Sequence, residues 1–280
     1  MSDVLINPLD LAEMLLGTPP VVLDVRWQLG DFDGREAYRA GHIPGAVYAD
    51  LDSELAAPPS GAVGGRHPIP PIEDLQAAAR SWGITDGVPV VVYDDSGNLA
   101  AARAWWLLRW AGIADVRLLD GGLAAWQAEG LRTTTGDGGR PRAGTVTLTG
   151  GNLPVATIHD VAAGTATLLD ARAGERYRGD VEPVDPRAGH IPGARSAPTV
   201  DNVDGTGRFR SADDLRRRFT DLGIIPGDGR EVIVYCGSGI NAAHEIAALA
   251  VVGVDATLFP GSFSQWSSDP DRPVTLGNQP

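Results

Sequence analysis

The chain has 280 residues, one cysteine and a formal net charge of −13 at pH 7. Its hydrophobic share of 43% and charged share of 21% are those of a globular protein, and at about 150 residues per domain its length predicts two domains. A single cysteine cannot form an internal disulfide, which excludes a secreted disulfide scaffold. The excess of acidic residues repels phosphate backbones and anionic lipid, so we expect no nucleic-acid partner.

Neither a targeting segment nor a membrane span is predicted. The first 17 residues contain no basic region and no long apolar core, unlike a signal peptide. No stretch approaches the roughly 18 uninterrupted apolar residues that a transmembrane helix needs. We therefore expect no membrane association and a reducing, cytoplasmic location.

Several motifs occur twice along the chain, in the same order. The paired copies begin at Asp24 and Asp170, Gly41 and Gly189, Val90 and Val232, and Asp120 and Pro260. Offsets of 140 to 148 residues indicate a duplicated domain rather than a solenoid repeat. The stretch between the copies is rich in Gly and Thr. We predict an N-terminal domain over residues 1–135, a linker over 136–152 and a C-terminal domain over 153–280.

Short apolar runs alternate with helical patterns in each half. Val90–Tyr93 and Val232–Tyr235 are continuous apolar runs of strand length, typical of buried parallel strands. Each precedes a helical stretch, over 100–111 and 242–252, and a further apolar segment follows. The pattern predicts an α/β fold with two tandem domains, each a mostly parallel sheet flanked by helices. Ligands bind such sheets beyond the carboxyl ends of the strands.

The only cysteine lies at such a strand end. Cys236 directly follows the predicted strand Val232–Tyr235 and precedes a predicted helix. Gly237 and Gly239 let the backbone turn tightly and direct N–H groups inward, and the helix N-terminus adds the positive end of its dipole. Many free cysteines are simply buried, but these surroundings favour a thiolate. We interpret Cys236 as a nucleophile, or as part of a site for an anion.

Three kinds of cysteine chemistry fit this loop poorly. A cysteine phosphatase needs an arginine six residues after the cysteine, where this chain has Ala242. A cysteine protease needs a histidine base beside the thiol, and nothing in the sequence places one there. A metal site lacks a second cysteine and any histidine pair at ligand spacing, so we expect no metal. Sulfur transfer remains, in which the thiolate accepts a sulfane sulfur, carries it as a persulfide and passes it on.

Both halves contain an Asp-x-Arg motif and a Gly-His-Ile-Pro-Gly-Ala motif, and the second half adds the loop Cys236-Gly237-Ser238-Gly239. In these features the chain resembles the two-domain rhodanese-like sulfurtransferases over nearly its whole length. Within that family the loop is similar to that of the 3-mercaptopyruvate branch, which reads CG(S/T)GVT; this chain has Ile240 and Asn241 at the last two positions. The thiosulfate branch carries basic residues in its loop, and none is present here. The resemblance implies sulfur transfer without a metal or an organic cofactor.

The resemblance also implies that only the C-terminal copy is catalytic. Asp94 stands in the first half where Cys236 stands in the second, and a carboxylate cannot carry a sulfane sulfur. We expect Asp94 to be structural and to accept hydrogen bonds from N–H groups of its own loop.

Further site residues follow from the resemblance. Arg176 and Arg187 would bind the carboxylate of the donor, since arginine forms a fork that matches a carboxylate. Ser238 would act in a relay with His67 and Asp52. Backbone N–H groups of the loop would come from Gly237, Gly239, Ile240 and Asn241.

The sequence therefore predicts a sulfurtransferase that takes sulfur from 3-mercaptopyruvate through a Cys236 persulfide. The partners expected are a small-molecule sulfur donor and a thiol acceptor such as thioredoxin, or cyanide in an assay. One alternative is a thiosulfate sulfurtransferase with the same nucleophile. Another is a persulfide carrier that performs no catalysis.

Overall fold

The computed structural model describes residues 4–30, 33–139 and 141–280. Contacts divide the chain into two compact units. The first comprises the chain up to Ala57, Pro70–Asn152 and Asp204–Phe209, and the second comprises Pro58–Ile69, Leu153–Val203 and Arg210–Pro280. The segment Pro58–Ile69 thus packs with the C-terminal half of the sequence, although it lies within the N-terminal half.

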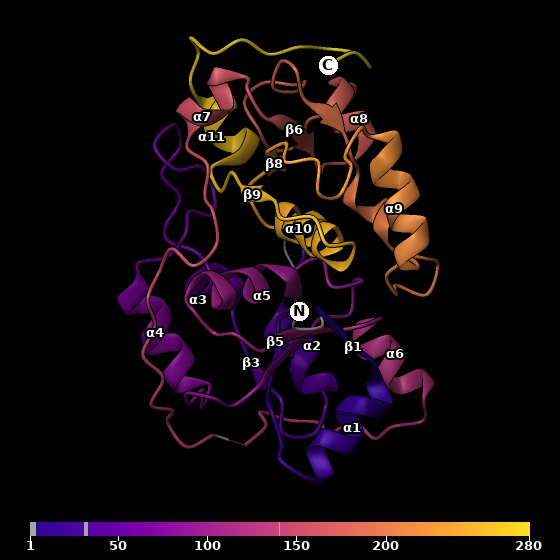
Figure 1. The fold of residues 1–280 in the computed structure, drawn as a ribbon. Helices are drawn as coiled ribbons and strands as arrows, with labels where there is room; N and C mark the ends of the chain where they lie inside the picture. The colour runs from indigo at the N-terminus through magenta and orange to yellow at the C-terminus, as the bar shows by residue number, and fades with distance from the viewer. Residues whose placement is uncertain (1–3, 31–32, 140) are drawn as a thin grey trace. The chain divides into compact units, whose positions relative to one another are not determined.

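The first unit is a parallel sheet covered by helices (Figure 1). Its five strands, counted over the described residues, run in the order β1-β5-β4-β2-β3, and every neighbouring pair is parallel. Side chains of α1 and α6 join one apolar cluster on the sheet, and α5 contacts β4 and β5. The elements are β1 (Leu5–Ile6), α1 (Pro8–Leu16), β2 (Val21–Asp24), α2 (Gly34–Ala40), β3 (Val47–Tyr48), α3 (Leu51–Glu54), α4 (Ile72–Ser81), β4 (Val90–Tyr93), α5 (Ala101–Trp110), β5 (Val116–Leu119) and α6 (Gly122–Ala128).

The second unit repeats this plan with a four-stranded parallel sheet in the order β7-β6-β8-β9, again counted over the part of the chain that is described. Side chains of α7, α8 and α11 join one apolar cluster, and α10 contacts β8 and β9. The elements are α7 (Ile158–Ala163), β6 (Thr167–Asp170), α8 (Gly174–Arg178), β7 (Arg195–Ser196), the 3-10 helix η1 (Thr199–Asn202), α9 (Ala212–Asp221), β8 (Val232–Tyr235), α10 (Asn241–Val251), β9 (Thr257–Leu258) and α11 (Ser262–Ser268).

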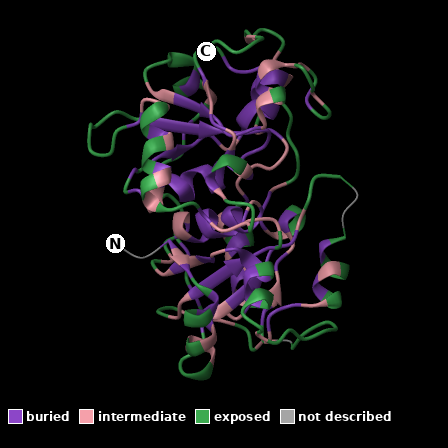
Figure 2. Ribbon diagram, turned by 90° about the vertical axis from the view of Figure 1, so that its right-hand side faces the viewer, coloured by how far each residue is buried: buried purple, intermediate pink, exposed green. Residues whose placement is uncertain are grey.

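The predicted α/β fold with two parallel sheets is confirmed. Strands β4 and β8 are buried along their whole length, as Figure 2 shows for the interior of each unit. Burial on both faces explains why their sequences are continuous apolar runs rather than alternating ones. Among the helices of the described residues, none has the length and apolar character that crossing a bilayer requires.

The repeated motifs have the same structural task in each unit. In the second unit, the Arg172 Nη2 atom donates to Asp170 Oδ2 (2.6 Å) and to the backbone oxygen of Gly189 (2.7 Å). This joins the end of β6 to the Gly-His-Ile-Pro-Gly segment. His190 stacks on Tyr177 with ring centroids 3.8 Å apart, and its Nδ1 lies 2.8 Å from the backbone oxygen of Tyr177. The motif histidine therefore packs inside the fold.

The first unit repeats these contacts with Asp24, Arg26 and Gly41. Arg26 Nη2 lies 2.8 Å from Asp24 Oδ2 and donates to the Gly41 oxygen over 2.8 Å. His42 stacks on Tyr38 at a centroid distance of 3.8 Å. Two copies of the same buried contacts explain why these motifs occur in both halves of the sequence.

Asp94 occupies the loop after β4, and its carboxylate is fully buried. Oδ1 accepts from the N–H groups of Ser96 (2.8 Å) and Asn98 (2.7 Å). Oδ2 accepts from the N–H groups of Ala100 (2.8 Å) and Ala101 (3.0 Å). Burial raises the pKa of Asp94, while these four hydrogen bonds oppose the shift. The loop is thus a set of four N–H donors around one carboxylate.

Asp94→Asn is expected to lower the free energy of unfolding by about 2 kcal/mol, because the asparagine NH2 group would face two of the four backbone donors and leave them unpaired. Chemical denaturation of the full chain measures the change. Asp95→Asn is the matched control: Asp95 is exposed, so its loss should cost less than about 0.5 kcal/mol. Equal stability of the two variants would contradict the role of Asp94.

Candidate active site

Cys236 lies between β8 and α10, in the position that Asp94 occupies in the first unit. It is a free cysteine and only 3% exposed. The N–H of Gly239 donates to its Sγ atom over 3.1 Å. Gly239 has φ +82°, a conformation that L side chains rarely adopt, and this lets the loop fold back over the sulfur. The sulfur is therefore held in a buried loop that directs a backbone donor at it.

The start of α11 holds the Cys236 loop in place. The N–H of Cys236 donates to Ser262 Oγ (3.2 Å), and the oxygen of Cys236 accepts from the N–H of Phe263 (3.0 Å). The N–H of Ser264 donates to the oxygen of Gly237 (2.9 Å). The backbone around Cys236 is thus bonded on both sides, so the loop is organised before any donor arrives.

Ser238 and His67 meet beside the cysteine. Ser238 is buried, and its Oγ lies 2.8 Å from Nδ1 of His67. His67 belongs to the segment Pro58–Ile69, which the amide of Gln265 holds by donating to the oxygen of Val63 (2.8 Å). The structure therefore brings together two of the three residues predicted to form a relay.

The remaining predicted residues lie as follows. Asp52 belongs to α3 of the first unit, where its Oδ2 accepts from the indole N–H of Trp27 over 3.0 Å. Ile240 is buried at the end of the Cys236 loop, and Asn241 is the first residue of α10. Gly237 is where two arginine side chains approach the loop.

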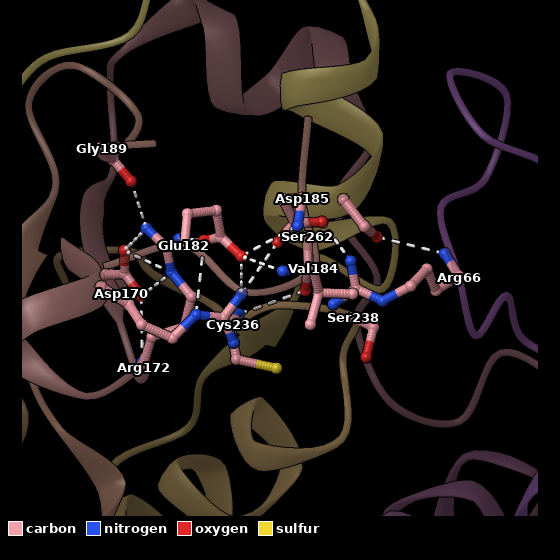
Figure 3. A network of polar contacts seen from close by, with 12 residues as sticks. Arg66, Asp170, Arg172, Glu182, Val184, Asp185, Gly189, Cys236, Ser238 and Ser262 are labelled. Carbon is pink, nitrogen blue, oxygen red and sulfur yellow. Dashed lines mark hydrogen bonds and ion pairs between the residues drawn. The ribbon is translucent and has the colours of Figure 1, made fainter. Parts of the chain in front are cut away.

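Arg176 belongs to a network of six charged side chains in the second unit. Its Nη2 atom donates to Glu182 Oε1 (2.7 Å) and Asp185 Oδ2 (3.0 Å). Figure 3 shows the side chain of Arg66 extending toward Asp185, with which it forms an ion pair. Positive and negative groups alternate along the network, in the order Asp170, Arg172, Glu182, Arg176, Asp185 and Arg66.

The two central carboxylates of the network are almost completely buried. Burial raises the pKa of Asp185, and the charge of Arg66 opposes this shift only in part. Burial also raises the pKa of Glu182, but hydrogen bonds from the Asp185 N–H, the Arg176 guanidinium and the Val184 N–H outweigh it, so its pKa is lowered. Of these two carboxylates, Glu182 is therefore the one whose ionised form is favoured by the fold.

Arg187, predicted to bind the donor, has its guanidinium bonded to backbone oxygens. Its guanidinium donates to the backbone oxygens of four residues at the end of α11 and just beyond it, and none of these belongs to the Cys236 loop. They are Ser267 (2.9 Å), Arg272 (2.7 Å), Trp266 (3.1 Å) and Asp269 (2.6 Å). Helix C-termini leave backbone oxygens without intrahelical partners, and Arg187 satisfies them here.

Sequence reasoning did not select Arg66, Glu182 or Asp185. One feature of the sequence could have indicated the two carboxylates: the arginine-rich segment of this acidic chain needs negatively charged partners if its arginines are buried. Arg66 is also the neighbour of His67. Its approach to Gly237 depends on tertiary packing, which no local pattern reports.

Comparison with known proteins places the chain in a family. Residues 7–129 and 157–269 each match the family model described as a rhodanese-like domain. The chain belongs to the rhodanese-like family. Both halves match it, as the repeated motifs predict.

Relatives of this rhodanese-like chain are similar over most of its length. SseB of Mycobacterium tuberculosis, whose name assigns it provisionally to the thiosulfate sulfurtransferases, is 51% identical over 99% of this chain and 98% of its own. The 3-mercaptopyruvate sulfurtransferase of Escherichia coli is 34% identical over 85% of each chain. The solved structure of the 3-mercaptopyruvate sulfurtransferase from Leishmania major matches with a TM-score of 0.84 and 27% identity, over 95% of this chain and 74% of that one. The names agree on sulfur transfer and differ in the donor.

Glu182→Gln tests the network through its pH dependence. The lowered pKa means that ionised Glu182 stabilises the fold above its ordinary pKa of 4.5, and that this stabilisation is lost as the pH falls through the lowered value. We expect the variant to be about 2 kcal/mol less stable at pH 7, with the difference shrinking in acid. Denaturation curves from pH 3 to pH 7 measure it.

Glu175→Gln is the control for this experiment, since Glu175 is exposed on α8. A difference between Glu182→Gln and the unsubstituted chain that stays constant with pH would refute the stabilising role of the ionised carboxylate.

Proposed function

We propose that this protein is a sulfurtransferase that moves one sulfur atom from 3-mercaptopyruvate, through a persulfide on Cys236, to a thiol acceptor such as reduced thioredoxin. The observation that carries the proposal is the pair of equivalent loops: a buried carboxylate accepts four N–H groups in one, and a buried free thiol stands in its place in the other. The sulfurtransferase names of relatives along nearly the whole chain support it.

The Asp94 loop indicates how a persulfide anion would be stabilised. Its carboxylate is a built-in anion, bonded by N–H groups two, four, six and seven residues further along the chain. The same positions after Cys236 are Ser238, Ile240, Ala242 and Ala243. A thiol has no two oxygens to accept hydrogen bonds from such a ring of N–H groups, as a carboxylate does. A persulfide adds a second sulfur atom, and this atom carries the negative charge. Backbone donors at that point offset the cost of burying the charge.

The transfer step balances without a metal, an oxidant or a reductant. The Cys236 thiolate attacks the sulfur of 3-mercaptopyruvate, an S–S bond forms and the C–S bond breaks. The electron pair of the C–S bond passes to the carbon, which becomes the enolate of pyruvate. The proton of the donor thiol ends on that carbon, so that pyruvate leaves and the anionic persulfide remains. Attack by an acceptor thiolate on the outer sulfur regenerates the Cys236 thiolate.

Ser238 and His67 are suited to the oxygen of the donor ketone. A Ser238 Oγ that donates to the ketone oxygen would stabilise the negative charge that develops as the enolate forms. His67, 2.8 Å from that Oγ, orients the hydroxyl and exchanges its proton. This assignment needs a ketone in the donor, which 3-mercaptopyruvate has and thiosulfate lacks.

The charges around the loop favour a monoanionic carboxylate over a dianion. Arg66, Arg172 and Arg176 are matched by three carboxylates in one network, so the arginines do not create a strongly positive site. The loop itself contains no basic residue. A doubly charged thiosulfate would be poorly compensated there once the thiolate has formed. The name of the mycobacterial relative favours thiosulfate instead, so both donors belong in the first experiment.

Intact mass after brief exposure to 3-mercaptopyruvate, with thiosulfate in parallel, tests the proposal. We expect a gain of one sulfur atom that dithiothreitol reverses and that Cys236→Ser abolishes. Because Cys236 is the only cysteine, the mass assigns the site directly. Faster loading by thiosulfate would favour the alternative donor. No gain with either donor would favour a carrier that receives its sulfur from a protein.

Ser238→Ala is expected to lower kcat with 3-mercaptopyruvate by about tenfold to a hundredfold, because a proton donor to the developing enolate is lost. Its effect on sulfur transfer from thiosulfate should be smaller, since that donor has no ketone. Ser96→Ala is the matched control, at the equivalent position of the first unit. An equal loss with both donors would refute a role of Ser238 at the ketone.

A further inference from the structure

Ser264, in the first turn of α11, bonds two segments that lie far apart in the sequence. Its backbone N–H donates to the oxygen of Gly237 (2.9 Å), and Gly237 immediately precedes Ser238. Its Oγ atom accepts from the backbone N–H of Arg66 (3.1 Å), and Arg66 immediately precedes His67. One residue thus holds the chain neighbours of both members of the Ser238–His67 pair.

The hydroxyl of Ser264 has a fixed direction. Ser264 is 3% exposed, and its Oγ–H donates to the backbone oxygen of Gly261 (2.9 Å). A serine hydroxyl carries one proton and two lone pairs, so this bond uses the proton and leaves Oγ as an acceptor. The N–H of Arg66 is therefore held at a set point on α11, as it would not be by an exposed hydroxyl that rotates freely.

The segment Pro58–Ile69 is shaped to approach Ser264 closely. The N–H of Gly65 donates to the oxygen of Gly61 (2.7 Å), which closes the segment into a tight turn. Gly65 has φ +79°, and a Cβ atom built there would lie 2.5 Å from both Ser264 Oγ and the oxygen of Gly261. A side chain at this position would push the segment away from α11, so glycine is needed for the contact.

The first unit lacks this hydrogen-bonding side chain. The second residue of α6 donates its N–H to the oxygen of Asp94 (2.9 Å), and the second residue of α11 donates to that of Cys236 (3.0 Å), so the two helices are equivalent. The next residue along the chain is Ala124 in α6 and Ser264 in α11. The hydroxyl therefore occurs only in the unit that contains the cysteine.

We propose that Ser264 is a positioning residue for the sulfur-transfer step: by bonding the chain neighbours of Ser238 and His67, it sets the 2.8 Å contact between their side chains. This inference rests on the proposed function, in which Ser238 donates to the ketone oxygen of the donor. Ser264 acts only through this pair. Loss of its Oγ would release the N–H of Arg66 and let His67 move relative to Ser238, and a displaced proton donor slows the reaction.

Ser264→Ala removes only the Oγ atom and introduces the residue that the first unit has. We expect kcat for sulfide release from 3-mercaptopyruvate to dithiothreitol to fall by about threefold to thirtyfold, because the donor to the ketone oxygen is displaced. KM should change little, since the variant removes no group that binds the sulfur donor. The loss with thiosulfate should be smaller, because thiosulfate has no ketone.

Ser267→Ala is the matched control. Ser267 lies on the same helix and is also 3% exposed, and among the described residues its Oγ has no hydrogen-bond partner. The substitution deletes the same atom without touching either segment, so kcat with both donors should stay unchanged.

The His67→Ala background separates a positioning role from a general effect on the fold. If Ser264 acts through His67, then Ser264→Ala should change the rate by less than about twofold once His67 is absent. The rate of persulfide loading from 3-mercaptopyruvate, followed by intact mass over hours, measures even slow variants. Hydrogen exchange gives a readout that needs no turnover: the amide of Arg66 should exchange at least about tenfold faster in Ser264→Ala and at the original rate in Ser267→Ala.

The outcomes separate the two proposals. An active wild-type enzyme in which Ser264→Ala behaves like Ser267→Ala overturns the positioning role and leaves the proposed function standing. Equal losses with both donors, a loss of the same size in the His67→Ala background, or unchanged exchange of the Arg66 amide also overturn it. A wild-type enzyme that takes no sulfur from 3-mercaptopyruvate overturns the proposed function, and the role of Ser264 with it.

Discussion

The buried ion pair between Asp170 and Arg172 determines how charge is arranged around the Cys236 loop. Both side chains are almost fully excluded from solvent, and removing two charges from water is costly unless each is completely hydrogen-bonded. Arg172 meets this requirement by bonding Asp170, the oxygen of Gly189 and Glu182. The pair therefore connects the end of a strand, a loop and the first carboxylate of the network that ends at Arg66.

The two units use one loop design for different purposes. After β4, a carboxylate in the chain itself satisfies the four converging N–H groups, and the loop is complete without a ligand. After β8, the thiol of Cys236 is bonded to one of the loop's N–H groups at 3.1 Å. The residue at the start of the loop thus separates the two units: Asp94 fills its loop with its own carboxylate, whereas Cys236 places a thiol there.

Arg66, Arg172 and Arg176 are each paired with a buried carboxylate. Arginines near a nucleophile attract anions in general, but arginines paired with buried carboxylates retain only their unused N–H groups for recognition. The directions of these N–H groups are fixed because the buried carboxylates that hold the guanidinium groups are fixed. Under the proposed function, such a site would select a donor by geometry more than by net charge.

Local rules were sufficient for much of the fold and for selecting the candidate nucleophile. Continuous apolar runs become buried parallel strands because both faces of each sheet are covered. Cys236 could be selected as a candidate because it directly follows a strand, where ligand loops of parallel sheets lie. The partnership of Asp94 with its own loop was likewise predictable, since a short acidic side chain after a strand reaches nearby N–H groups.

The sequence by itself thus determined the α/β class, the duplication, the family and the candidate nucleophile, because each depends on residues close together or repeated along the chain. Tertiary structure decided which arginines face the loop. Arg66 reaches it through a segment with no periodic pattern, held by Gln265, while Arg187 bonds helix-end carbonyls about 80 residues away. A long flexible side chain takes the direction that its partners impose, and those partners are brought together only by folding.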